Sequence, residues 1–158
     1  MRRILGLLIL VWLALPFGLQ GQERTPEVQR LGDWIGDWTY TISSQESAGS
    51  MSFEWFGDLL VRAEEHTPAG YDVLHMMGFD PEEGVYIWRR YWNTGLVDMG
   101  QGWVHGNTWT FLFLEEPGNI RRMTMAFETP DVLAFRWERS VEGGPWEVTS
   151  EGRTTRTR

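Results

Sequence analysis

From residue 38 to the C-terminus, hydrophobic and polar side chains alternate along the chain with a period of two residues. Residues 38–42, with the sequence WTYTI, show this pattern clearly. Such alternation is typical of a β-strand with one apolar and one polar face. It predicts about ten strands, at residues 38–42, 51–56, 59–66, 72–79, 85–92, 96–104, 108–114, 120–128, 132–141 and 146–156.

Short segments rich in Gly, Pro, Asn and Asp separate these strands, as in residues 80–84 (DPEEG) and 93–95 (NTG). Connections this short join antiparallel neighbours in sequence order. The sequence therefore predicts an all-β fold, a single up-and-down antiparallel barrel, because closure removes exposed sheet edges. The competing all-β fold, a two-sheet sandwich, usually needs longer crossover connections. No linker or second domain interrupts residues 22–158.

Residues 25–35 follow a period of three to four instead, which predicts a short helix before the first strand. Thr25 can accept a hydrogen bond from the first helical turn, and the proline that follows it suits that turn. Gly36 then ends the helix. The apolar positions on one face of the helix are Val28, Leu31, Trp34 and Ile35.

Residues 1–21 combine two arginines, a short apolar run and a break at Pro16 and Gly18. A basic start followed by a short apolar stretch is typical of a secretory signal peptide. A membrane-spanning helix needs roughly 20 apolar residues, and the proline comes too early for one. We therefore expect cleavage near Gly21, in preference to an uncleaved anchor, and a periplasmic or secreted protein. No cysteine follows the apolar run, so a lipoprotein is excluded.

The chain of 158 residues has no cysteine, ten tryptophans and a formal net charge of −8. An exported protein without cysteine depends on its core rather than on disulfides. Removal of residues 1–21 takes away two arginines and no acid, which makes the charge of the mature chain −10. Nucleic acid and anionic lipid surfaces are poor partners for such a charge. We expect no nucleic-acid partner and no stable membrane insertion after signal cleavage.

The tripeptide Gly-Asp-Trp occurs at residues 32–34 and again at 36–38, and we expect the first copy to be helical and the second to open the first strand. A helical turn followed by Gly-x-Trp resembles the calycin superfamily, which includes lipocalins, fatty-acid-binding proteins and nitrobindin-like haem barrels. In lipocalins this Trp closes one end of the barrel, and an Arg from the last strand packs across its ring. The resemblance implies a structural end-cap made by Gly36, Trp38, and Arg153 or Arg156.

The whole mature chain also resembles an uncharacterised family of bacterial exported proteins. The resemblance lies in the Leu-x-x-Trp-x-Gly-x-Trp opening of residues 31–38, the Gly-Phe-Asp-Pro turn of residues 78–81 and the Arg-rich final strand. It implies that the mature chain is one calycin-like barrel domain.

Alternation also indicates which polar side chains share a face with apolar ones. In residues 85–92, Trp88 and Arg90 lie on one face, which we expect to be interior because its aromatic residues have more apolar area to bury. Three other segments likewise place one basic or titratable group on an otherwise apolar face. The candidate ligand-binding residues are Trp88, Arg90, Trp137, Arg139, Arg121 and His75.

Two interpretations of these arginines remain open. In the first, Arg90, Arg121 and Arg139 receive an anionic ligand in an aromatic cavity, since a guanidinium can hold a carboxylate through two hydrogen bonds. The resemblance to fatty-acid-binding proteins implies the same, because those proteins receive lipid carboxylates on buried arginines. In the second, the arginines form salt bridges with acids such as Glu128 or Glu138.

The other titratable residues indicate no metal site. His66, His75 and His105 lie on three segments without the spacing of a metal motif. Nitrobindins bind haem through a His near the C-terminus, where this chain has none, and we expect no cofactor. Adjacent acids such as Glu64-Glu65 and Glu115-Glu116 are expected to be solvated.

No familiar nucleophile, phosphate-loop or dinucleotide motif occurs, so we assign no catalytic residues. We expect a non-catalytic exported barrel for a small hydrophobic or amphipathic, anionic ligand. Two alternatives remain open. An enzyme using the same cavity would show titratable groups with perturbed pKa values inside it, and a filled structural barrel would show no cavity.

Overall fold

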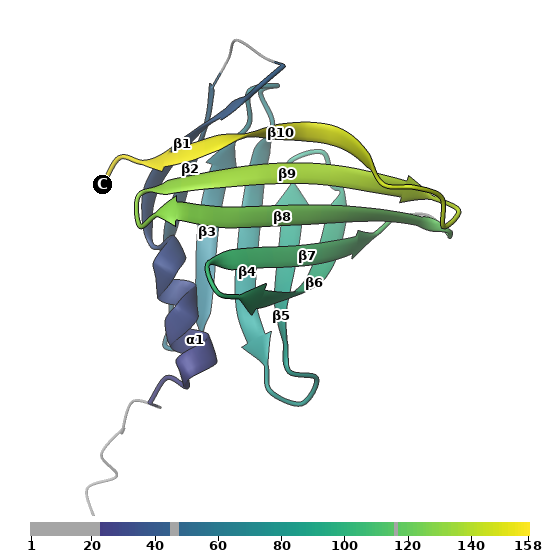
Figure 1. Ribbon diagram of the computed structural model, residues 1–158. Coiled ribbons are helices and arrows are strands. Elements are labelled where there is room, and N and C mark those ends of the chain that lie inside the picture. The colour runs from purple at the N-terminus through teal and green to yellow at the C-terminus, as the bar shows by residue number, and fades with distance from the viewer. Residues whose placement is uncertain (1–22, 45–47, 116) are drawn as a thin grey trace, which may run out of the picture.

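The computed structural model describes residues 23–44, 48–115 and 117–158, which form a closed antiparallel barrel of ten strands (Figure 1). Each strand pairs with its neighbours in sequence, and the first strand pairs with the last to complete the ring. The predicted all-β, up-and-down barrel is confirmed. The strands are β1 (Gly36–Ile42), β2 (Ala48–Phe56), β3 (Leu60–His66), β4 (Asp72–Asp80), β5 (Val85–Trp92), β6 (Val97–His105), β7 (Thr108–Leu114), β8 (Asn119–Thr129), β9 (Val132–Val141) and β10 (Glu147–Arg156).

The largest difference from the predicted strand limits is at β2, which begins at Ala48 instead of residue 51. Gly49 lies there opposite Tyr40 of β1, and a Cβ atom at Gly49 would come within 2.2 Å of the tyrosine ring. Glycine is depleted in strands, which is why the alternation pattern is lost at this point. In the folded chain it makes room for Tyr40 inside the barrel.

A short helical segment precedes the barrel, as the period of residues 25–35 predicted. It consists of the α-helix α1 (Pro26–Arg30) and the 3₁₀ turn η1 (Leu31–Trp34). The Thr25 side chain accepts a hydrogen bond from the first turn, as expected of an N-cap. The helical segment ends at Trp34, so the prediction that Ile35 belongs to the helical face is wrong. The 3₁₀ turn ends one residue before the predicted end of the helix, and β1 begins at Gly36 instead of residue 38.

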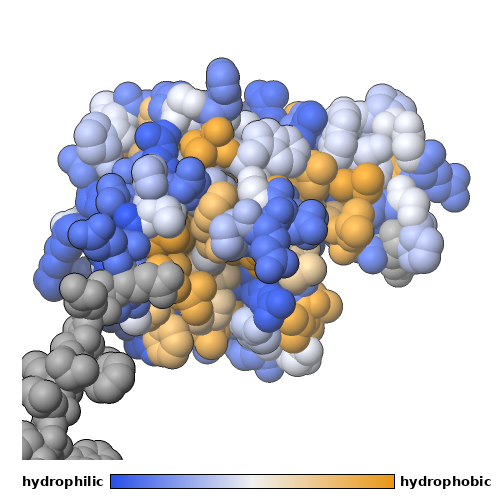
Figure 2. All heavy atoms as spheres, turned by 90° about the horizontal axis from the view of Figure 1, so that it is seen from below, coloured by the Kyte–Doolittle hydropathy of each residue, from blue (hydrophilic) through white to orange (hydrophobic). Residues whose placement is uncertain are grey.

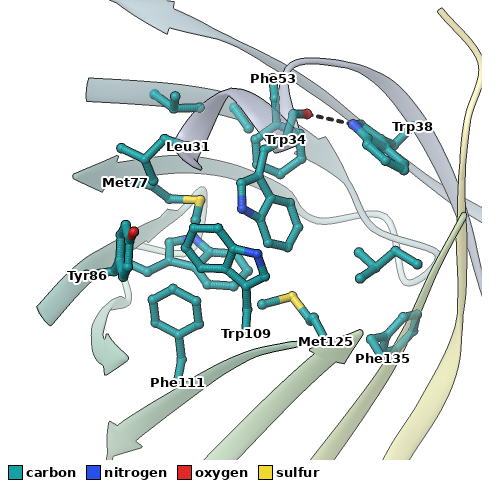
Figure 3. Close-up of a cluster of buried hydrophobic side chains, with 14 of the residues drawn as sticks. Leu31, Trp34, Trp38, Phe53, Met77, Tyr86, Trp109, Phe111, Met125 and Phe135 are labelled. Carbon is teal, nitrogen blue, oxygen red and sulfur yellow. Dashed lines mark hydrogen bonds between the residues drawn. The ribbon is translucent and has the colours of Figure 1, made fainter. Parts of the chain in front are cut away.

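Trp34 closes one end of the barrel interior (Figure 3). Its ring lies between 5.4 and 5.6 Å, centroid to centroid, from those of Phe53, Trp109 and Phe127, and only 2% of the residue is exposed. Full burial of an aromatic side chain contributes about 1.5–3 kcal/mol. Together with Val28 and Leu31, which are also buried, Trp34 holds the helical segment to the barrel by apolar contact.

Trp38, at the start of β1, completes this closed end. Its indole Nε1–H donates a hydrogen bond to the main-chain oxygen of Trp34 at 2.7 Å (Figure 3). The guanidinium of Arg156, from β10, lies 4.3 Å from the centroid of the Trp38 ring, in the range of a cation–π contact. Gly36 has a φ of +131°, and a Cβ atom there would lie 2.4 Å from the main-chain oxygen of Arg158. Only glycine fits this approach of β1 to the C-terminal residues.

Arg153, the other arginine that the resemblance suggested, lies on the outside of the barrel. Successive strand residues face opposite sides, so Arg153 and Arg156, three positions apart, point in opposite directions. The Arg153 side chain is 68% exposed and pairs with Glu128 at 2.9 Å. Of the two arginines, Arg156 covers Trp38.

The outer surface mixes hydrophilic and apolar side chains, as the face seen in Figure 2 shows. Alternation sends most polar strand residues outward, while a few large apolar side chains, such as Phe56 and Leu114, remain exposed. A folded protein has too little polar surface to cover itself, so these side chains alone indicate no function.

The predicted signal peptide, residues 1–21, lies outside the described residues. Within the described ranges, no helix combines the length and the apolar character needed to cross a membrane.

The contact between Trp38 and Arg156 can be measured by a double-mutant cycle. We expect Trp38→Ala to lower the free energy of unfolding by about 3–5 kcal/mol, as deletion of a core aromatic does. The cycle with Arg156→Ala should give a coupling of about 0.5–2 kcal/mol. Arg153→Ala is the matched control and should be additive with Trp38→Ala. Additivity for Arg156, or coupling for Arg153, in denaturant unfolding would contradict the described end-cap.

Candidate functional site

A cavity of about 410 Å³ lies inside the barrel. It extends from Trp34 at the helix-closed end to the β3–β4 turn at the other end, where Pro68 and Tyr71 line it. Small-molecule sites typically have volumes of about 300–1,000 Å³. Most of the lining side chains are apolar, among them Trp34, Phe53, Trp88, Met125, Leu133, Phe135 and Trp137. The interior therefore has room for a small, mainly apolar molecule.

The orientation of β5 explains how the cavity obtains its polar groups. Tyr86, Trp88 and Arg90 are buried, whereas Arg89 and Tyr91 are exposed. The face that carries Trp88 is thus the inner face, as its larger aromatic area indicated. An arginine on this face enters an apolar interior, where it needs a partner of opposite charge.

Five of the six candidate ligand-binding residues line the cavity: His75, Trp88, Arg90, Arg121 and Trp137. Arg139 does not. It shares the inner face of β9 with Trp137 but lies two residues nearer the strand's end, and 44% of its side chain is exposed. Alternation correctly indicates the face on which a side chain lies, but not its depth along the barrel axis.

Four side chains in the cavity wall form one hydrogen-bonded chain. The Trp88 indole Nε1–H donates to Nδ1 of His75 at 2.9 Å. Nδ1 is therefore an acceptor, which assigns the ring proton to Nε2. Nε2 donates to Oε2 of Glu65 at 2.9 Å, and the Tyr40 hydroxyl donates to Oε1 of the same carboxylate. This hydrogen-bonded chain links β5, β4, β3 and β1.

The hydrogen-bonded chain keeps Glu65 ionised. Burial on its own raises the pKa of Glu65, but hydrogen bonds from His75 and Tyr40 and the positive charge of Arg90 outweigh it and hold the pKa below its ordinary value. Burial, and next the negative charge of Glu65, raises the pKa of Tyr40. At neutral pH the cavity wall therefore presents a carboxylate and an un-ionised phenol.

The expectation that Glu65 is solvated was wrong, because only 13% of its side chain is exposed. The reason is that Glu65 lies on the same face of β3 as Val61 and Ala63, which are buried. The same alternation that placed Arg90 inside also places Glu65 inside, and it was visible in the sequence. Adjacent acids on a strand face opposite sides, and in this pair Glu64 is the exposed one.

A second polar group, the arginine network, lies at the open end of the cavity. Nε and Nη2 of Arg90 donate to Oδ1 and Oδ2 of Asp98 at 2.8 and 2.6 Å. Arg121 donates to Asp98 Oδ2 at 3.0 Å and also pairs with Glu115, and Arg139 pairs with Glu115 at 3.0 Å. Three guanidinium groups thus share two carboxylates. Salt bridges account for all three candidate arginines, with Asp98 and Glu115 as partners.

Arg90 is held by aromatic rings as well as by its carboxylate. Its guanidinium carbon lies 4.6 Å from the ring centroid of Phe113 and 4.8 Å from that of Trp137. Burial lowers the pKa of Arg90, although the hydrogen bonds and charge of Asp98 oppose this effect. Removing one partner of a buried ion pair costs about 3–5 kcal/mol, since the other charge is then unpaired. The burial of Arg90 therefore depends on its ion pair with Asp98.

Metal binding has no support in the described part of the chain. In residues 23–44, 48–115 and 117–158 no group of three His, Cys, Asp or Glu side chains lies close enough to hold an ion. His75, the one buried histidine of these ranges, has both ring nitrogens in hydrogen bonds.

A second hollow, of about 990 Å³, lies on the outside of the barrel, over β6 to β10 and the end of β1. Trp103 and Trp146 line it together with charged pairs such as Arg122 and Glu138, whose atoms lie 2.8 Å apart. Its polar groups are thus already paired, and it lies on the outside of the sheet. The interior cavity, enclosed by apolar side chains with a few convergent polar groups, is the better candidate site.

No family model and no curated protein matches this chain. Its fold is similar to that in the crystal structure of Rv2717c from M. tuberculosis, with a TM-score of 0.57, 13% sequence identity, and coverage of 86% of this chain and 100% of the other. At this identity the similarity shows the fold alone. Because the match covers most of this chain and all of the other, the two proteins share the barrel fold.

The lowered pKa of Glu65 predicts a pH-dependent contribution to stability. A carboxylate whose pKa is lower in the folded state stabilises the fold above its unfolded pKa, near 4.5, and loses this contribution as the pH falls through the folded pKa. At pH 7, Glu65→Gln should lower the free energy of unfolding by about 1.5–3 kcal/mol, the contribution of hydrogen bonds to a charged group. The difference from wild type should shrink below the unfolded pKa.

Denaturant titrations over a pH series measure this difference. Glu64→Gln, which removes a carboxylate from the outer face of the same strand, is the matched control and should unfold like wild type. A constant difference between wild type and Glu65→Gln at every pH would contradict an ionised, hydrogen-bonded Glu65.

Proposed function

We propose that this chain is an exported, non-catalytic barrel that binds a small hydrophobic or amphipathic ligand in its interior cavity. The observation that carries the proposal is the cavity itself, about 410 Å³ of space lined by apolar side chains and a few polar ones. The lipocalin-like fold supports it, because closed barrels of this size can enclose one small ligand.

The arrangement of the titratable groups favours binding over catalysis. Tyr40, Glu65 and Arg90 have shifted pKa values and line the cavity, which is the feature expected of an enzyme. Each of these groups is already hydrogen-bonded to another side chain, however, which leaves it less able to transfer a proton to or from a substrate. Both nitrogens of His75 are occupied, and a carboxylate with a lowered pKa is a weak general base.

An anionic ligand has less support than a neutral or cationic one. Arg90 already holds Asp98 through two hydrogen bonds, and Arg121 and Arg139 share Glu115. A ligand carboxylate would have to share these guanidinium groups with acids that already pair with them. Glu65 adds a further negative charge to the cavity wall, so the proposal relies on the apolar body of the ligand.

Binding can be tested with N-phenyl-1-naphthylamine, a neutral fluorophore that brightens in apolar surroundings. We expect saturable binding of one molecule per chain, with energy transfer from the cavity tryptophans. Leu133→Trp places a larger side chain in the cavity and should weaken binding about tenfold or more. Ala134→Trp, the next residue on the outer face of β9, is the matched control and should bind like wild type.

Unfolding curves must show that both variants are folded, since overpacking costs about 1–3 kcal/mol. Absence of saturable binding to wild type would reject the proposal. Equal binding to a folded Leu133→Trp variant would place the probe outside the cavity.

Export rests on the signal-like sequence of residues 1–21. When the full chain is expressed in a bacterium with a Sec pathway, we expect the protein in the periplasm or medium, with an N-terminus within a few residues of Gly21. N-terminal sequencing and fractionation measure this. An intact Met1 on exported material would reject cleavage, and protein found only in the cytoplasm would reject export.

A further inference from the structure

Trp88, His75, Glu65 and Tyr40 form one hydrogen-bonded chain, and every N–H and O–H hydrogen of these side chains is donated within it. The indole N–H of Trp88 is donated to His75, and the Nε2–H of His75 is donated to Glu65. The hydroxyl hydrogen of Tyr40 is donated to the other carboxylate oxygen. None of these side chains has a polar hydrogen left for a ligand.

Several acceptor positions of the same groups remain. A carboxylate has about four lone-pair positions, and His75 and Tyr40 occupy one on each oxygen of Glu65. The phenol oxygen of Tyr40 also has a free lone pair. Tyr40 and Glu65 both line the cavity. This part of the wall can therefore accept hydrogen bonds but cannot donate them.

The wall around Glu65 also carries a negative charge that its immediate partners do not neutralise. His75, with its proton on Nε2 and its Nδ1 accepting from Trp88, is neutral. The positive charge of Arg90 lowers the pKa of Glu65 from a distance, but the hydrogen bonds of its guanidinium go to both oxygens of Asp98. Aromatic faces lie beside the group, with the ring centroid of Phe135 at 6.1 Å from that of Tyr40 and that of Phe53 at 6.4 Å from His75. Such faces attract cations.

We infer that the cavity selects an apolar ligand that carries a hydrogen-bond donor, a protonated amine or a hydroxyl, and that this donor binds Glu65 and the Tyr40 oxygen. The inference rests on the proposed function and names the polar group of its ligand. An amine binds more tightly than a hydroxyl because it also gains the charge of Glu65 and the aromatic faces. A ligand carboxylate is disfavoured because it brings a second negative charge and no hydrogen.

A series of ligands that share a ten-carbon alkyl chain and differ in their polar group tests this selectivity. Decylamine, decanol, decyl methyl ether and decanoate compete with N-phenyl-1-naphthylamine on the wild-type protein at neutral pH. We expect decylamine to bind most tightly, then decanol, with the ether about tenfold to a hundredfold weaker than the amine, the factor for a hydrogen bond to a charged group. Decanoate should bind most weakly.

Glu65→Gln separates recognition from packing. It keeps the shape of the side chain, removes the charge and replaces one acceptor oxygen by an N–H donor. Decylamine should lose about tenfold or more in affinity, decanoate should gain, and the ether should be unchanged. Glu64→Gln, on the outer face of β3, should leave all four affinities as in wild type. If Glu65→Gln does not fold, the order of the four ligands on wild type decides.

Equal affinities of the amine, alcohol and ether on wild type would overturn the donor selectivity while leaving the proposed function intact. Decanoate binding most tightly would overturn it in favour of the arginine network. Failure of the fluorophore and of all four ligands to bind would instead reject the proposed function, and the selectivity with it.

Discussion

The packing of Trp34 and Trp38 at one end of the barrel is the interaction on which the rest of the structure depends. The Trp38 indole N–H donates a hydrogen bond to the main-chain oxygen of Trp34 at 2.7 Å, and the guanidinium of Arg156 packs against the Trp38 ring. This contact joins the helical segment to the first and last strands, where the barrel closes. It also makes Trp34 the floor of the cavity. Because this end of the barrel is closed, the interior forms a cavity that opens only at the opposite end.

The interior combines a large apolar area with a small number of charged groups that have partners, although the indole N–H groups of Trp34 and Trp109 have none among the described residues. Burying an unpaired charge is costly, and a partly satisfied polar network is worse than an apolar one. Arg90 accordingly has Asp98, and Glu65 has His75 and Tyr40. The two groups differ in what they leave available. The arginines are paired with acids, whereas Glu65 and Tyr40 line the cavity and retain unused acceptor positions.

Much of the fold and part of the candidate site could be predicted from local patterns. Alternation indicated the strands and the inner faces, and five of the six candidate residues line the cavity. Arg139 was placed on the correct face but at the wrong depth, because depth depends on the tilt and stagger of strands in the closed barrel. Glu65 was missed because both acids of the pair were expected to be solvated, although adjacent strand residues face opposite sides and Glu65 shares its face with Val61 and Ala63.

The sequence by itself determined the elements, their antiparallel order and which side chains share a strand face, because these follow from a two-residue period and short turns. For β5, the larger aromatic area also indicated the buried face. Only the tertiary structure decided the partners. Arg156 rather than Arg153 covers Trp38, Asp98 holds Arg90, and Glu65 lies beside His75. Such pairs join different strands, and their register is set when the barrel closes. One residue of slip would move every side chain of a strand to the other face.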